Sequence, residues 1–196
     1  MIDEYKTISH HIGEGIYTEK RSKFLAFSHF VENVDDIKQL VQDYRKRYYD
    51  ARHVCYAYML GHERKDYRAN DDGEPGGTAG KPILGQINAL ELTNVLVIVV
   101  RYYGGINLGT GGLVVAYRQA AREALDNAEV ITRQVEEQVE YNFTYPMMND
   151  VMRIVKEMSP RIVSQTFETN CSITLSIRKS EAEQLRQRLA KLSFGE

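Results

Sequence analysis

The sequence predicts an α+β protein of two domains, residues 1–130 and 131–196. One observation is the continuous apolar run Val95–Val100, which is typical of a strand buried on both faces. A second is the tail from about Ile131, where alternating strand-like segments are interleaved with helical ones. The composition, with 43% apolar and 27% charged residues among 196, is ordinary for a globular protein of this size.

Side-chain periodicity predicts the elements of the first domain in turn. Alternating or aromatic-rich segments indicate strands, and apolar residues at helical spacing indicate helices. The expected elements are a strand over 12–17 paired with one over 23–31, a helix from 33 to about 49, a strand over 53–60, a polar loop over 61–80, a helix over 82–92, a strand over 95–101 and a helix over 113–127. Asn33 is the expected N-cap of the first helix, since its side chain can accept from free N–H groups of the first turn.

The second domain follows the order β-α-β-β-α. The expected elements are a strand over 135–145, a helix over 147–158, strands over 161–168 and 170–178, and a helix from the capping box at Ser180–Glu183 to about Leu192. This order is that of a ferredoxin-like unit without its last strand. Ser193–Glu196 is too short to supply that strand, so either the chain is truncated or the sheet lacks that edge.

Charge and cysteine content exclude several classes of protein. A net charge of −2 provides no global field that would draw the chain to nucleic acid or to an anionic membrane, so nucleic-acid binding needs a local basic patch. Cys55 and Cys171 lack metal-ligand spacing and are expected to be buried reduced thiols. No signal peptide and no apolar run long enough for a membrane span is visible. We therefore expect a cytoplasmic protein that has no membrane association.

The segment Gly104–Gly112 is the strongest functional signal. It follows the buried strand and precedes a helix, and helix N-termini carry free N–H groups and partial positive charge. The expected phosphate-binding or nucleic-acid-binding residues are Arg101, Tyr102, Gly104, Gly105, Gly109, Thr110, Gly111 and Gly112, extended by Arg21, Lys23 and Arg118. The alternative is that these glycines only turn the chain and allow close packing. The spacing is neither G-x-x-x-x-G-K-[ST] nor G-x-G-x-x-G, and no Lys follows Gly112, which disfavours a Walker-type ATPase.

The acidic segment Asp71–Pro82 is the second signal. Asp71, Asp72 and Glu74 form a weak candidate site for Mg²⁺, because carboxylate oxygens are its usual protein ligands; the alternative is ordinary turn chemistry. Further functional candidates are His53, Thr78 and Gly80. Thr78 could cap the following helix. His53 is either a hydrogen-bonded scaffold residue or a general base. A less favoured alternative is that it forms a thiolate–imidazole pair with Cys55.

Four motifs resemble the IMPACT family in its bacterial YigZ branch. They are Arg21-Ser-Lys-Phe24, His53-x-Cys-x-Ala57, Asp71-Asp-Gly-Glu-Pro-x-Gly-Thr-Ala-Gly-x-Pro82 and Arg101-Tyr-Tyr-Gly-Gly-x-x-Leu-Gly-x-Gly-Gly-Leu-Val-x-Ala-Tyr117. The resemblance implies a ribosomal protein S5 domain 2-like first domain and a ferredoxin-like second domain similar to domain V of elongation factor G. It also implies a link to translation, since eukaryotic members regulate translation initiation. Val115 and Val54 depart from the basic and polar residues common in the family; Arg118 can replace the charge beside the loop.

Three functions remain open at this stage. The first is a non-catalytic protein that binds RNA or the ribosome and is linked to the regulation of translation. The second is an enzyme that binds a nucleotide or phosphorylated metabolite with the glycine-rich loop and Mg²⁺. The third is a protein-interaction module that uses the acidic turn and the open sheet edge. No cofactor is expected, and the oligomeric state is left open.

Overall fold

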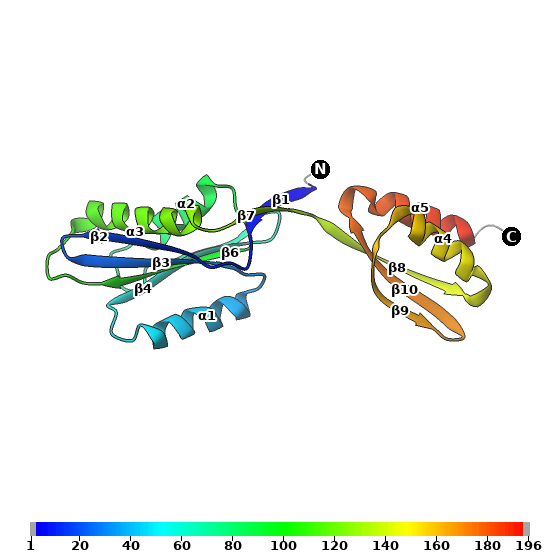
Figure 1. Ribbon diagram of the computed structural model, residues 1–196, viewed down its shortest axis with the longest axis horizontal. Coiled ribbons are helices and arrows are strands. Elements are labelled where there is room, and N and C mark those ends of the chain that lie inside the picture. Colours follow the sequence, from blue (N-terminus) through cyan, green and yellow to red (C-terminus); the bar gives the residue numbers. More distant parts are fainter. Residues whose placement is uncertain (1–2, 194–196) are drawn as a thin grey trace. The chain divides into compact units, whose positions relative to one another are not determined.

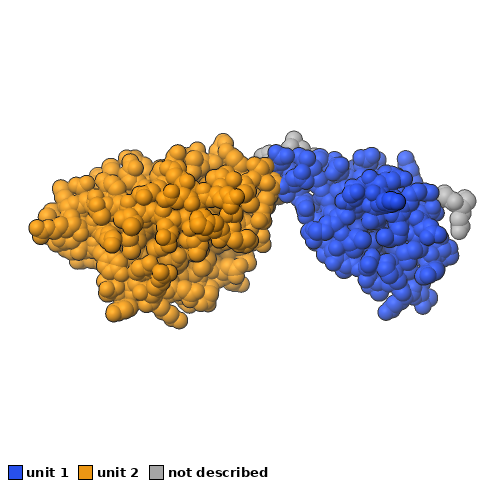
Figure 2. Space-filling view, viewed as in Figure 1, with its two compact units in different colours: residues 1–4, 134–196 blue, residues 5–133 orange. Residues whose placement is uncertain are grey.

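The computed structural model describes residues 3–193 of the chain. The chain folds as two compact units, one formed by residues 5–133 and the other by residues 134–196 with residues 1–4 (Figure 2). Each unit contains both helices and strands and has its own hydrophobic core. The predicted α+β class is therefore confirmed.

A five-stranded antiparallel sheet forms the centre of the first unit. Its strand order is β2 (Gly13–Glu19), β3 (Ser22–Phe30), β6 (Val95–Tyr102), β4 (His53–Leu60) and β5 (Asp66–Asn70). Every residue of Val95–Val100 is fully buried, as the apolar run predicts for a central strand. Helices α2 (Gly80–Ala89) and α3 (Gly109–Asp126) cover one face of the sheet, and α1 (Val34–Arg47) covers the other (Figure 1).

Local sequence explains where α1 begins. The side chain of Asn33 accepts a hydrogen bond of 2.8 Å from the backbone N–H of Asp36, which is the predicted N-cap. Ile37, Val41 and Tyr44 recur at helical spacing and are buried against the sheet. Capping and amphipathic periodicity thus act together on this helix.

Two predictions for the first unit were wrong. The segment 61–80, expected to be loop, contains β5, a mostly exposed edge strand without an apolar face. Helix α3 begins at Gly109 and not at Leu113, so the last four residues of the glycine-rich segment are its first turn. Tertiary packing of the rest of α3 stabilises a glycine-rich turn that helix propensity alone disfavours.

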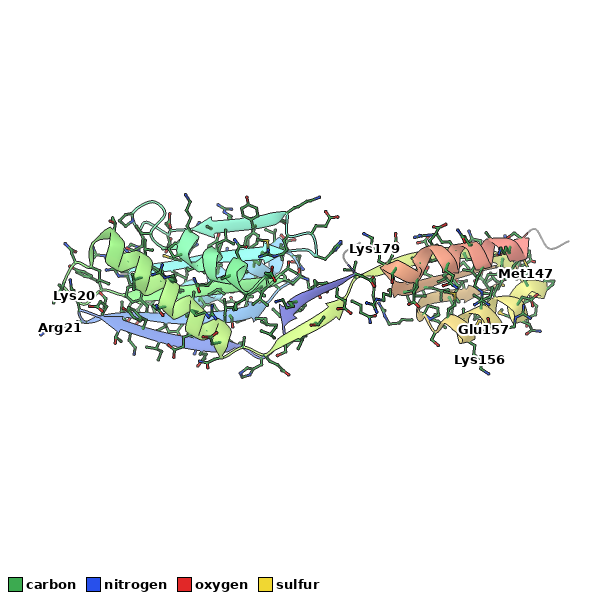
Figure 3. All side chains as sticks on the ribbon, turned by 90° about the horizontal axis from the view of Figure 1, so that it is seen from above. Lys20, Arg21, Met147, Lys156, Glu157 and Lys179 are labelled. Carbon is green, nitrogen blue, oxygen red and sulfur yellow. The ribbon has the colours of Figure 1, made fainter. Side chains whose placement is uncertain are left out.

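Two shorter features complete the description of this part of the chain. β1 (Glu4–Ile8) and β7 (Val130–Gln134) pair as a separate two-stranded sheet. Lys20 and Arg21 form the turn of the β2–β3 hairpin, with φ of 47° and 66°, and Figure 3 shows their exposed side chains at its tip. Left-handed conformations at both turn residues match the right-handed twist of the two strands.

The second unit is a three-stranded antiparallel sheet with two helices. Its sheet order is β8 (Glu136–Thr144), β10 (Asn170–Arg178) and β9 (Arg161–Phe167). The helices α4 (Met148–Met158), preceded by the short turn η1 (Tyr145–Met147), and α5 (Lys179–Ser193) enclose its core (Figure 1). The β-α-β-β-α order and the central position of β10 are those of a ferredoxin-like unit. Among the described residues, no strand pairs with the outer edge of β8. Across residues 3–193, no helix is both long and apolar enough to cross a membrane.

Candidate functional site

A pocket of about 440 Å³ opens where β4 begins and β6 ends. The antiparallel register places His53 of β4 directly opposite Arg101 of β6, and Arg101 is also opposite Phe24 of β3. The pocket is lined by Arg52, His53, Gly73, Glu74, Pro75, Arg101, Tyr103, Asn107, Leu108, Gly109, Thr110 and Leu113. It therefore joins the two motifs that the sequence marked, the acidic turn and the glycine-rich segment.

The carboxylate of Glu74 occupies the floor of this pocket, with a side chain only 3% exposed. Nη1 of Arg101 donates to both of its oxygens, at 2.7 and 2.8 Å. The hydroxyl of Tyr117 donates to Oε2 at 2.8 Å, and Nε2 of His53 lies 2.9 Å from Oε1. Such a buried carboxylate is tolerated because cationic and hydroxyl donors satisfy both oxygens.

Behind Glu74, Cys55 and Tyr117 extend the buried network. The Sγ of Cys55 lies 3.1 Å from the carbonyl oxygen of Asp71 and 3.4 Å from the hydroxyl of Tyr117. Burial raises the pKa of both Cys55 and Tyr117 far above their usual ranges. Cys55 is thus a protonated structural thiol, and the thiolate–imidazole pair with His53 is not formed.

The N-terminus of α3 also lines the pocket. Leu108 at the N-cap offers no side-chain hydrogen bond, and the first turn holds no acidic residue. The N–H groups of Gly109, Thr110 and Gly111 therefore have no partner from within the helix. Gly109 adopts a φ of 75°, which favours glycine, and together with exposed Thr110 it lines the pocket. The free N–H groups of this helix start carry partial positive charge, and the binding of an anion to them stays a prediction.

Two arginines and a tyrosine flank this helix start. The guanidinium of Arg52, an exposed residue, lies 4.7 Å from the ring centroid of Tyr103, and that of Arg101 lies 5.5 Å from the same ring. Arg101 itself is only 7% exposed and is committed through Nη1 to Glu74. Its Nε is buried without a partner among the described residues. Arg52, which sequence reasoning left out of the site, is the more accessible of the two cations; its place directly before His53 was the available signal.

The three carboxylates proposed for Mg²⁺ point to three different partners. Asp71 accepts from the backbone N–H groups of Gly77, Ala79 and Gly80 at the start of α2. Asp72 accepts from the N–H of Val54 at 2.8 Å and pairs with Arg45, whereas Glu74 enters the pocket. Within residues 3–193, no group of three or more His, Cys, Asp or Glu residues is arranged to hold a metal ion. The proposed convergence on Mg²⁺ was therefore wrong, because each carboxylate satisfies a different buried donor.

The remaining residues of the acidic segment have structural contacts. Thr78 was expected to cap α2, but its hydroxyl donates to the carbonyl oxygen of Pro75 at 2.6 Å, and the carboxylate of Asp71 accepts from the first N–H groups of α2 instead. A Cβ at Gly80 would lie 2.5 Å from the backbone nitrogen of Asn70. Glycine is therefore required there by close packing. Nδ1 of His53 lies 2.7 Å from the carbonyl oxygen of Asp72.

The glycines of the segment 104–112 divide between the two predicted roles. A Cβ at Gly104 would lie 2.1 Å from the backbone carbon of Arg21, and the N–H of Gly104 donates to Oγ of Ser22. Gly105 adopts a φ of 88°, and Gly112 packs against Leu108. Gly104, Gly105 and Gly112 therefore serve chain direction and packing, whereas Gly109 borders the pocket.

The other predicted binding residues lie outside the pocket lining. Arg21 and Lys23 are exposed on the β2–β3 hairpin, and Arg118 is exposed on α3. Tyr102 is half-buried and its hydroxyl donates to Asp50 at 2.9 Å. Gly111 is exposed in the first turn of α3, and nothing lies within 4 Å of the Cβ position there.

The fold and the pocket define the chain as a two-domain α+β protein with a basic pocket at a helix start in its first domain. Residues 20–125 match the model of the Impact N-terminal domain, which spans more than half of the chain. An IMPACT family member from Haemophilus influenzae is 32% identical over 90% of this chain and 86% of its own length. The IMPACT family member YigZ of Escherichia coli is 31% identical over 90% of this chain and 87% of its own length. A crystal structure described as that of a hypothetical protein superposes with a TM-score of 0.78 at 26% identity, over 100% of this chain and 95% of the other. The chain belongs to the IMPACT family.

Proposed function

We propose that this protein binds RNA without catalysis, in the cytoplasm and in connection with translation. The observation that carries the proposal is the juxtaposition, across one pocket, of the uncapped start of α3 with the guanidinium groups of Arg52 and Arg101. Backbone N–H groups, a hydroxyl and guanidinium donors are the groups that most often contact nucleic-acid phosphates. Membership of the IMPACT family supports the link to translation that the sequence resemblance implies.

In this proposal a phosphate binds at the mouth of the pocket. The N–H groups of Gly109 and Thr110 and the exposed Arg52 would donate to its oxygens. The guanidinium of Arg101, which its hydrogen bonds to Glu74 hold in place, would attract the phosphate by its positive charge. Tyr103, whose exposed ring lies beside both guanidinium groups, would stack on a base.

Exposed basic residues would extend this contact beyond the pocket. Arg21 and Lys23 lie on the β2–β3 hairpin, and the backbone of Arg21 packs directly against Gly104 of the glycine-rich segment. Arg118 lies two turns along α3 from its start. Because the net charge of the chain is −2, this local set of cations, and not the whole molecule, would attract the phosphate backbone.

The test is RNA affinity measured by fluorescence anisotropy over a series of salt concentrations. Arg52→Ala should weaken binding about tenfold or more and lower the slope of log affinity against log salt by about one, as expected for one lost phosphate contact. Arg68→Ala is the matched control, since Arg68 is exposed on β5 and does not line the pocket. Unchanged affinity in Arg52→Ala would exclude the pocket as the RNA site. Co-sedimentation with ribosomes at low and high salt then tests the connection with translation.

The size of the pocket favours one alternative, a small phosphorylated ligand. A volume of about 440 Å³ lies within the range of small-molecule sites, and the polar floor formed by Glu74 and His53 is typical of them. A ligand at about 100 times its dissociation constant raises stability by about 2.7 kcal/mol, which a thermal-shift assay with ATP, GTP and nucleoside monophosphates detects. A shift with a nucleotide but no binding of RNA would replace the proposed function by this alternative.

A further inference from the structure

His53 is fixed in the pocket by two polar contacts. Nδ1 faces the carbonyl oxygen of Asp72 at 2.7 Å. Nε2 faces Oε1 of Glu74 at 2.9 Å, a carboxylate oxygen that also accepts from Arg101. His53 thereby links the acidic turn to the buried carboxylate.

The arginines that line the pocket outnumber its carboxylate by one. Arg52 and Arg101 are the cations, and Glu74 is the anion. The two neighbouring carboxylates do not enter the pocket, since Asp71 accepts from the start of α2 and Asp72 pairs with Arg45. The uncapped start of α3 adds about half a positive charge. In a pocket partly removed from water, this positive excess attracts an occupant with two negative charges more strongly than an occupant with one.

The donors point to the same conclusion. A terminal phosphate has three oxygens that accept hydrogen bonds, whereas a bridging phosphodiester has two and carries a single negative charge. The rim offers at least three separate groups, namely the N–H groups of the first turn of α3, the exposed Thr110 hydroxyl and the Arg52 guanidinium. Beneath them, Arg101 is more than nine-tenths buried, lines the pocket and keeps an Nε without a partner among the described residues.

We infer that the preferred occupant of this pocket is a phosphomonoester, such as the phosphorylated end of an RNA chain or of a free mononucleotide, and not an internal phosphodiester. The inference rests on the proposed function in that both use the same pocket as a phosphate site. It adds the class of phosphate, and with it a preference for RNA ends over continuous strands.

The experiment compares three forms of one short RNA, with a 5′-phosphate, with a 3′-phosphate and with hydroxyls at both ends. At least one phosphate-ended form should bind about tenfold tighter than the hydroxyl-ended form, the size of effect expected when charge-assisted hydrogen bonds are gained. Thr110→Val, at an exposed position, removes one donor of the pocket and should reduce this preference, and Arg68→Ala should leave it unchanged.

Adenosine 5′-monophosphate serves as competitor and separates the two sources of the phosphate. If the mononucleotide displaces phosphate-ended RNA only at large molar excess, the RNA end is the preferred ligand of the pocket. If it displaces that RNA near equal concentration, the free mononucleotide is the preferred ligand. Equal affinity for all three RNA forms, combined with weaker binding in Arg52→Ala, would overturn the phosphomonoester inference and leave RNA binding intact. Binding of the mononucleotide without binding of any RNA would support the inference and overturn the proposed function. A preference that persists undiminished in Thr110→Val would overturn the inference.

Discussion

Removal of the Glu74 carboxylate should strongly destabilise the first unit. The side chains of Glu74 and Arg101 are 3% and 7% exposed, and Nη1 of Arg101 donates to both carboxylate oxygens at 2.7 and 2.8 Å. Glu74→Ala leaves the guanidinium buried without its counter-charge and also removes the acceptor of the Tyr117 hydroxyl. Loss of one partner of such a pair costs about 3–5 kcal/mol of unfolding free energy.

Urea denaturation followed by circular dichroism measures this loss. Because the chain has two compact units, the transition of residues 5–133 must be resolved from that of the second unit, and the change belongs to the first transition alone. The double variant Glu74→Ala/Arg101→Met should recover much of the stability, since it removes the unpaired guanidinium charge of Arg101 as well as the Glu74 carboxylate. Glu91→Ala is the control, because Glu91 and Lys6 form an exposed ion pair at 3.6 Å.

Two outcomes would refute this reasoning. If Glu74→Ala cost less than about 1 kcal/mol, the pair would behave like a solvated surface ion pair and the floor of the pocket would be wet. If the double variant were no more stable than Glu74→Ala alone, the loss would come from a cavity and not from an uncompensated charge. Either result would also remove the charge balance on which the phosphate site depends.

Two further predictions concern the glycine-rich segment and the acidic turn. Gly104→Ala should destabilise the first unit by about 3 kcal/mol, since its Cβ would lie 2.1 Å from the backbone of Arg21. The Cβ of Gly111→Ala would meet no atom within 4 Å, so this variant should stabilise α3 by about 0.5–1 kcal/mol. Thermal melting of both variants measures the two effects, and equal effects would contradict the prediction. Burial alone would raise the pKa of Asp71, but three backbone N–H groups at the start of α2 hold it below its ordinary value of 3.8. The stability that Asp71 confers is therefore fully present above that value and is lost as the pH falls through the lower folded value. Asp71→Asn should cost about 1 kcal/mol at pH 7, and its deficit relative to the unaltered chain should shrink below pH 4 in urea titrations; a deficit independent of pH would exclude the capping role.

The elements with strong periodicity could be predicted from the sequence alone. Val95–Val100 is apolar without interruption because both faces of β6 are covered, and Asn33 starts α1 through a bond within its own turn. Both features are visible in consecutive residues of the sequence, so pattern and capping rules suffice to predict them. The edge strand β5 was not predicted because its residues are mostly exposed and show no apolar alternation.

The joining of the two motifs into one pocket depends on long-range contacts of the folded chain. The register of β4 against β6 brings His53 beside Arg101, and the turn after β5 delivers Glu74 beneath them, from positions far apart in the chain. The tertiary structure also divides the roles among similar residues: Asp71 binds a helix start while Glu74 binds an arginine, and Gly104 packs while Gly109 borders the pocket. Residue type and spacing do not encode these assignments, because each is set by which buried donor or backbone atom the folded chain places within reach.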